Sequence, residues 1–297
     1  MRSVGGLLAA AGHGRAATVE HAHSRRAAVW RVERGAEVLA TTLDLPAPAN
    51  CVAIRGDARQ LAVGGGDGVV RVYRTADWSA VVALGLPTAC GDDAVHCLDY
   101  SPDGGERLAA GYKRGVFAVF DVASGAAVRR IDRAALSTSE GLIALFAPAG
   151  DVLVLGGSNS NKVVLVELAP APVHAASMPR AGELGAPATL GGAAFGGGRV
   201  ALAAGSRLVV RTGAGCGDSN GGPSTVLMDV DVGDTLQAHF NVKSPVVLRP
   251  DGLHVAGITK TKGVTVRAVR TGDEVFALGP WRGRPGCSSG VWDACLN

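Results

Sequence analysis

Short runs of apolar residues, separated by turns rich in glycine, proline and charged residues, follow one another along most of the chain. In residues 101–121 (SPDGGERLAAGYKRGVFAVFD), a Ser-Pro-Asp-Gly turn leads into an apolar run that ends at Gly111. A second turn follows, and residues 116–120 then form an alternating run of the kind that is typical of a half-buried strand. The stretch therefore predicts two antiparallel strands joined by a tight turn.

The order of apolar strand, turn, apolar strand and alternating strand recurs, in residues 51–74, 97–121, 142–168, 188–212 and 244–269. The last apolar residue of the first strand advances by 46, 46, 49 and 53 positions, at Ile54, Tyr100, Phe146, Phe195 and Leu248. A period of roughly 40 to 50 residues with several strands per unit is typical of propeller blades. A small sheet cannot bury both faces alone, and stacking around an axis buries them.

The motifs within these units resemble those of WD-repeat proteins, in degenerate form and over most of the chain. The order that carries the resemblance is the Ser-Pro-Asp-Gly turn, the "LAAG" strand, a turn and "VFAVFD". Phe120-Asp121 stands where that family has its Trp-Asp pair, and Tyr73-Arg74 and Trp30-Arg31 occupy the same place less faithfully. The resemblance implies an all-β fold, a β-propeller of four-stranded antiparallel blades that occupies residues 1–297 as a single domain.

The number of blades depends on how the two ends of the chain are interpreted. Counting back one period from Ile54 reaches residue 8, inside a "LLAAAG" run that looks like a second strand, so we expect residues 1–45 to form an incomplete first blade. The last four residues, "ACLN", resemble the first-strand stretch at residues 96–99, and we expect residues 288–297 to complete that blade. This arrangement gives six blades, and a truncated seven-bladed chain is the alternative. Residues 1–17 also have the arginines and the lack of acids of an organellar transit peptide, but we favour a strand because "LLAAAG" recurs later as "LAAG".

The amino-acid composition excludes several classes of function for this protein. Hydrophobic residues make up 47% of the 297 positions and charged residues 19%, which is typical of a globular chain. A net charge of +3 with 4% aromatic residues argues against a nucleic-acid-binding surface. The six cysteines include no C-x-x-C pair, and no apolar run is long enough for a membrane helix. We therefore expect a cytoplasmic or nuclear protein with no metal, no cofactor and no membrane span.

Basic residues gather in one class of turn. The turns between the second and third strands of a WD-type blade open on one face of the ring, here called the second-turn face. They carry six basic residues, Lys113, Arg114, Lys162, Arg207, Lys260 and Lys262, against a single acid, Asp67. The turns after the first strands, on the opposite or first-turn face, carry Asp57, Asp103, Glu106, Asp151 and Asp251. This asymmetry predicts a partner-binding face for acidic protein segments, with ordinary solvated turns as the alternative.

No motif of an enzyme is present in the sequence. It contains no G-x-S-x-G elbow, and "GGGDG" at residues 64–68 lacks the lysine and the helix of a phosphate loop. We therefore expect a non-enzymatic protein-interaction scaffold, a propeller that serves as a docking platform within a multiprotein complex. Two alternatives stay open. One is an enzyme or ligand-binding propeller with its site at the central channel, and the other is a basic surface that binds acidic lipid or nucleic acid.

Overall fold

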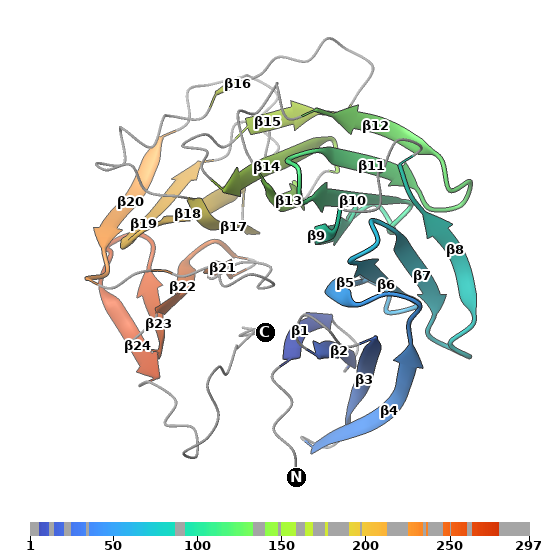
Figure 1. Ribbon diagram of the computed structural model, residues 1–297. Helices are drawn as coiled ribbons and strands as arrows, with labels where there is room; N and C mark the ends of the chain where they lie inside the picture. Colours follow the sequence, from blue (N-terminus) through green and yellow to red (C-terminus); the bar gives the residue numbers. More distant parts are fainter. Residues whose placement is uncertain are drawn as a thin grey trace.

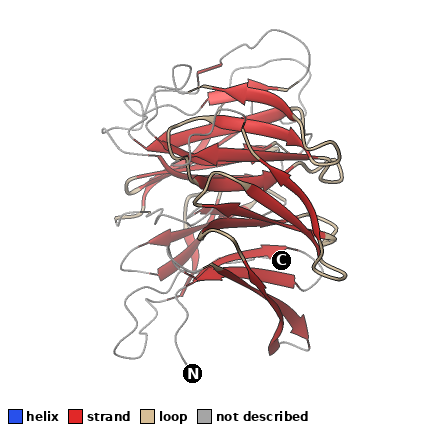
Figure 2. Cartoon of the chain, turned by 45° about the vertical axis from the view of Figure 1, so that its right-hand side comes forward, coloured by secondary structure: helices blue, strands red, loops and turns tan. Residues whose placement is uncertain are grey.

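A ring of small antiparallel sheets forms the protein, as the computed structural model shows (Figure 1). The described residues contain twenty-four strands and no helix, and Figure 2 shows strands throughout this part of the chain. The all-β propeller predicted from the repeats is confirmed. The structure describes residues 6–11, 15–20, 25–33, 36–86, 93–132, 140–147, 150–158, 164–168, 176–177, 190–196, 198–212, 225–233, 236, 246–249, 251–259 and 263–278.

Each sheet is built from four consecutive strands, and we number the six described sheets as blades 1 to 6 in chain order. Blade 1 consists of β1 (Gly6–Ala11), β2 (Arg15–Glu20), β3 (Arg26–Glu33) and β4 (Ala36–Asp44). Blade 2 consists of β5 (Ala49–Ile54), β6 (Gln60–Gly65), β7 (Val70–Arg74) and β8 (Ala80–Leu84). Blade 3 consists of β9 (Val95–Tyr100), β10 (Arg107–Tyr112), β11 (Phe117–Asp121) and β12 (Ala127–Ile131).

The second half of the chain repeats this plan. Blade 4 consists of β13 (Glu140–Phe146), β14 (Val152–Ser158), β15 (Val164–Glu167) and β16 (Ala176–Ser177). Blade 5 consists of β17 (Leu190–Gly196), β18 (Arg199–Ala204), β19 (Arg207–Thr212) and β20 (Val226–Asp231). Blade 6 consists of β21 (Val246–Leu248), β22 (His254–Thr259), β23 (Gly263–Ala268) and β24 (Glu274–Leu278).

The first strand of each blade lies toward the centre of the ring and the fourth strand lies at its outside (Figure 1). First strands of consecutive blades contact one another, from β1 and β5 through to β17 and β21. The same order of strands therefore repeats from blade to blade. Equivalent positions of different blades can be compared directly.

Blade 1 differs from its sequence-based description. All four of its strands lie within residues 6–44, whereas the sequence predicted that its first strand would be missing. Residues 15–20 form β2 and pair with both β1 and β3. The small apolar run in β1 resembles second strands in sequence, which explains the misassignment. Residues 288–297 lie outside the described residues, so their pairing with this blade stays a prediction.

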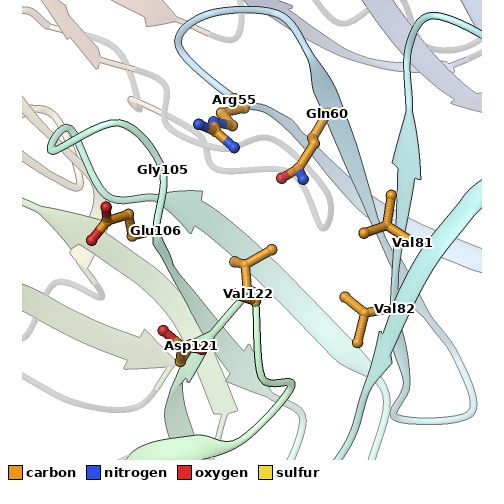
Figure 3. A pocket seen from close by; sticks show the side chains of 9 residues that line it. Arg55, Gln60, Val81, Val82, Gly105, Glu106, Asp121 and Val122 are labelled. Carbon is orange, nitrogen blue, oxygen red and sulfur yellow. The ribbon is translucent and has the colours of Figure 1, made fainter.

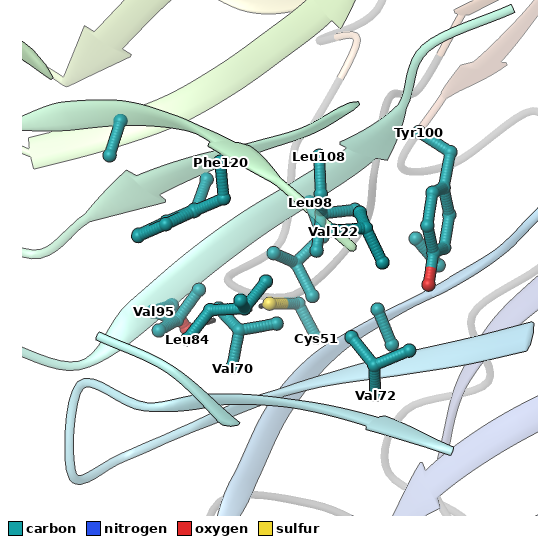
Figure 4. Packing of buried hydrophobic residues seen from close by; sticks show 14 of the residues in the cluster. Cys51, Val70, Val72, Leu84, Val95, Leu98, Tyr100, Leu108, Phe120 and Val122 are labelled. Carbon is teal, nitrogen blue, oxygen red and sulfur yellow. Dashed lines mark hydrogen bonds between the residues drawn. The ribbon is translucent and has the colours of Figure 1, made fainter. Parts of the chain in front are cut away.

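Apolar side chains fill the junctions between consecutive blades, where five clusters of buried residues lie in the described part of the chain. The cluster between blades 2 and 3 includes Leu84 from one blade and Leu98 and Phe120 from the other (Figure 4). Gly64 allows these two blades to approach, because a Cβ there would lie 2.5 Å from Cys51 Sγ and 2.7 Å from Val95 Cγ1. Close packing between blades 2 and 3 therefore depends on the absence of a side chain at residue 64.

Candidate functional site

The described part of the second-turn face carries three of the six basic residues that the sequence singled out. Lys113 and Arg114 lie in the turn between β10 and β11, where Tyr112 and Val116 close the hairpin through a 2.9 Å backbone hydrogen bond. Both side chains belong to exposed residues, and Arg207 begins β19 at the same end of blade 5. Lys162, Lys260 and Lys262 lie outside the described residues.

Two of these three described basic residues already have acidic neighbours. Arg114 Nε lies 3.0 Å from Asp93 Oδ1. Arg207 donates from Nε to Asp229 Oδ1 at 3.0 Å, and a second ion-pair contact joins its Nη2 to Asp229 Oδ2. The hydrogen bonds to Asp229 raise the pKa of the Arg207 guanidinium. These pairs reduce the positive potential that the sequence count suggested for the face.

Arg71 and Asp67 form a further pair on this face. Arg71 donates to both carboxylate oxygens of Asp67, at 3.1 and 2.6 Å. Burial alone would raise the pKa of Asp67, but the hydrogen bonds from Arg71 and from the Val69 backbone lower it overall. The one acid that the sequence placed in these turns is therefore paired within its own hairpin.

Polar residues are sparse on the innermost strands around the central opening. Two acids lie on the described first strands: Glu140 begins β13, and Asp99 on β9 accepts at its Oδ2 a 2.9 Å hydrogen bond from the backbone N–H of Phe146 on β13. The Asp99 carboxylate is thus engaged in holding two blades together. Among the described residues, no three His, Cys, Asp or Glu side chains gather in a way that could hold a metal ion.

The first-turn face carries a recurring bridge between neighbouring blades. Arg107, the first residue of β10, donates from Nη2 to the carbonyl of Gly150 in blade 4 at 2.8 Å and to Asp103 Oδ2 at 2.6 Å. Arg199, the first residue of β18, donates in the same way to the carbonyl of Gly252 in blade 6. An arginine at the start of the second strand therefore reaches the turn of the next blade at two junctions.

A groove of about 470 Å³ opens on the first-turn side between blades 2 and 3 (Figure 3). Its lining combines apolar and charged groups: Arg55, Gln60, Val81, Val82, Gly105, Glu106, Asp121, Val122 and Ala123. The aliphatic part of the Arg55 side chain packs against Gly105. A Cβ added to Gly105 would lie 2.6 Å from Arg55 Cγ. The Arg55 guanidinium pairs with Asp57 of its own turn, with Nε 3.3 Å from Oδ2.

Sequence reasoning did not find this groove. The repeat does show a difference at this junction, because Gln60 begins β6 where the equivalent strands β10 and β18 begin with Arg107 and Arg199. The groove itself depends on the distance between two blades, which no alignment of units provides.

Comparisons with known proteins agree with this architecture. The model of the family described as the anaphase-promoting complex subunit 4 WD40 domain matches residues 59–146. A chain from a structure described as the crystal structure of the mitotic checkpoint complex is similar, with a TM-score of 0.66 and 16% identity; the match covers 88% of this chain and 74% of that one. No curated protein matches the chain.

A second solved structure is similar over a larger share of the chain. It is described as a functionally unknown protein from Desulfotomaculum acetoxidans DSM 771, with a TM-score of 0.72 and 10% identity. The match covers 93% of this chain and 86% of that one. At these identities, the two structures support the propeller fold alone.

Proposed function

We propose that the chain, a β-propeller whose degenerate repeats resemble those of WD-repeat proteins, is a non-enzymatic docking platform for other proteins within a complex. A rigid ring presents many turns and edges without having to move, which suits protein binding. The matched family, which is described as a domain of a subunit of the anaphase-promoting complex, supports a role within a complex.

The exposed apolar side chains of the outermost strands are the observation that carries this proposal. Among the described residues, seven of the eight large exposed hydrophobics lie on fourth strands: Val38, Leu39, Val81, Val128, Val226, Val275 and Phe276. Each fourth strand pairs with a third strand on one side, and no described strand pairs with its other edge. Apolar side chains beside open backbone groups favour contact with another protein.

The second-turn face supports a preference for acidic partner segments within the same proposal. Lys113 and Arg114 project from a tight turn, and the sequence places Lys162, Lys260 and Lys262 in the equivalent turns. Because Arg114 and Arg207 have acidic neighbours, the lysines supply most of the net positive charge available to a partner. Such charges steer association more than they strengthen it.

We place this activity in the cytoplasm or nucleus. The thiols of Cys51 and Cys97 are buried and reduced, as expected in a reducing compartment. Over the part of the chain that is described, no helix has the length and apolar character needed to cross a membrane.

Affinity purification from native cells, followed by mass spectrometry, tests the proposal. The tagged protein should retain a reproducible set of proteins, and simultaneous reversal of Lys113, Arg114, Arg207, Lys260 and Lys262 to glutamate should release some of them. The matched control is Arg59→Glu on the first-turn face, where the arginine side chain is 83% exposed. No co-purifying protein would contradict the platform, and an unchanged set after reversal would contradict the choice of face.

A further inference from the structure

The outermost strands of blades 2 and 3 occupy equivalent places and differ in charge. β8 has the sequence AVVAL and β12 has the sequence AVRRI, and the two strands share one pattern of buried and exposed residues. Their pairing with the third strand also matches, because a register shift follows Val72 in blade 2 and Val119 in blade 3. The two strands therefore differ mainly at their third and fourth residues, which are Val82 and Ala83 in β8 and arginines in β12.

β8 is the uncharged member of the longer fourth strands. Each of the other described fourth strands with five or more residues carries charge of one sign: Glu37 and Asp44 on β4, Arg129 and Arg130 on β12, Asp229 and Asp231 on β20, and Glu274 on β24. Around β8, no charged residue occurs in the sequence between Asp77 and Asp92. Charged side chains on an edge strand discourage pairing with a further strand. Within the described part of the chain, β8 is therefore the fourth strand of this length that lacks such protection.

The edge of β8 is accessible from outside the ring. Ala80, Val81 and Ala83 are exposed, Val81 to 41%, and no described strand pairs with the edge that faces away from β7. A Cβ added to Gly85, just after the strand, would meet nothing within 4 Å. β8 itself lies on the outer rim (Figure 1). Open backbone groups beside small apolar side chains favour the addition of another strand.

The register shift near the start of β8 does not explain this difference in charge. The same shift occurs where β4, β12, β20 and β24 pair with their third strands. Beyond it, Val82, Ala83 and Leu84 each pair in regular register with a residue of β7. A regular stretch of edge thus remains available for pairing.

Charge also indicates which partner strand suits this edge. When two copies of one strand pair antiparallel about a two-fold axis, each residue lies near residues of the same strand in the other copy. A strand with charges of one sign then brings like charges together, which is destabilising. Self-pairing would bring acids together on β4, β20 and β24 and arginines together on β12. Among these strands, β8 alone is electrostatically compatible with its own copy.

From these observations, we propose that β8 pairs with β8 of a second copy of this chain, antiparallel and about a two-fold axis near Val82. Two four-stranded blades then form one eight-stranded sheet, held by backbone hydrogen bonds at residues 82–84 and by apolar contact of Val81 with Ala83 across the axis. One pair of strands buries little surface, so we expect a weak dimer with a dissociation constant on the order of 100 µM. The inference goes beyond the docking role, because it assigns one edge to contact between identical chains.

Sedimentation velocity of the purified full chain, from about 5 to 500 µM, tests the dimer. The unchanged chain should pass from monomer to dimer over this range. Val81→Lys should weaken the dimer at least about ten-fold, since it places a cation of each copy beside the axis. The matched control is Val128→Lys at the equivalent position of β12, where the side chain is 56% exposed; it should dimerise like the unchanged chain. Circular dichroism checks that each variant is folded.

Two further measurements separate pairing from a general effect of charge. A mixture of Val81→Lys and Val81→Glu brings opposite charges together across the axis, so it should dimerise more strongly than either variant alone. Amide hydrogen exchange of the unchanged chain should slow at residues 80–86 as the protein concentration rises, and exchange in β12 should not change.

A chain that stays monomeric up to about 500 µM, equal weakening by Val81→Lys and Val128→Lys, or no gain on mixing would overturn the β8 pair. Association into species larger than a dimer would also overturn it, since a two-fold pair is closed. If the Val81 variants fail to fold, the concentration dependence of exchange in the unchanged chain decides the question. Because these experiments use the purified chain alone, none of their results bears on whether other proteins co-purify with it.

Discussion

Arg107 in blade 3 donates a 2.8 Å hydrogen bond to the backbone carbonyl of Gly150 in blade 4. The same guanidinium pairs with Asp103 and lies 5.6 Å from the centre of the Phe146 ring. One side chain thus joins the second strand of one blade to the turn and first strand of the next.

Replacing Arg107 with methionine should lower the free energy of unfolding by about 1.5 to 3 kcal/mol, since hydrogen bonds of a charged group are lost at a partly buried site. Urea unfolding followed by circular dichroism measures the change. Arg59→Met is the matched control and should change stability by less than about 0.5 kcal/mol, because its side chain is 83% exposed. Equal effects of the two substitutions would show that the bridge contributes nothing.

Gly64→Ala should destabilise the fold by about 1 to 3 kcal/mol through overpacking. The added methyl group would lie 2.5 Å from Cys51 Sγ and 2.7 Å from Val95 Cγ1, both of which are buried between blades 2 and 3. Gly56→Ala serves as the control because nothing lies within 4 Å of its added Cβ. Thermal unfolding of the two variants compares them directly, and a Gly64→Ala protein as stable as the control would contradict the tight junction.

Ala58→Gly should raise the free energy of unfolding by up to about 1 kcal/mol. Ala58 has φ of 56°, at a turn position where blade 6 has Gly252 with φ of 69°. Trp78 has φ of 62° and aligns with Gly125 of blade 3, but its side chain packs against the cluster between blades 1 and 2. Trp78→Gly should therefore lower stability while Ala58→Gly does not, and chemical unfolding separates the two. A clear loss on Ala58→Gly would mean that its methyl group matters more than its backbone conformation.

Acid should destabilise the protein partly through Asp103. Burial alone would raise the pKa of this carboxyl, but hydrogen bonds from Ser101 and Arg107 lower it overall. Because the folded-state pKa lies below the ordinary value of about 3.9, the stabilisation is present above that pH and is lost as the pH falls through the folded-state pKa. Urea unfolding from pH 6 downward, with pH steps of about 0.5, should show a shallower decline for Asp103→Asn than for the unchanged chain. Identical slopes would rule out a contribution from this residue.

Much of the architecture could be predicted from the sequence because each blade repeats the same turns at nearly the same spacing. Gly252 of the turn after a first strand and the hairpin glycines Gly68 and Gly115 stand where the repeat placed them, and all three have positive φ. The first blade was harder to predict, because a short run of alanines in β1 suits a first or a second strand equally well.

The charge of the second-turn face could not be predicted from a count of basic residues. Arg207 meets Asp229 across two neighbouring strands, twenty-two positions apart in sequence, and Arg114 meets Asp93 in the preceding connection. Such pairs depend on strand register. The groove next to Gln60 likewise depends on the separation of two sheets, although the exchange of arginine for glutamine was visible in the repeat.

The consecutive order of strands within each blade also bears on how the chain folds as the ribosome releases it. Every described sheet can form once its own four consecutive strands have left the ribosome, because none of its described strands pairs with a strand far away in the sequence. Blades 2 and 3, together with the groove between them, need nothing beyond residue 132 for their pairing. Vectorial synthesis can therefore assemble the ring blade by blade, and each finished sheet provides an apolar face on which the next one condenses.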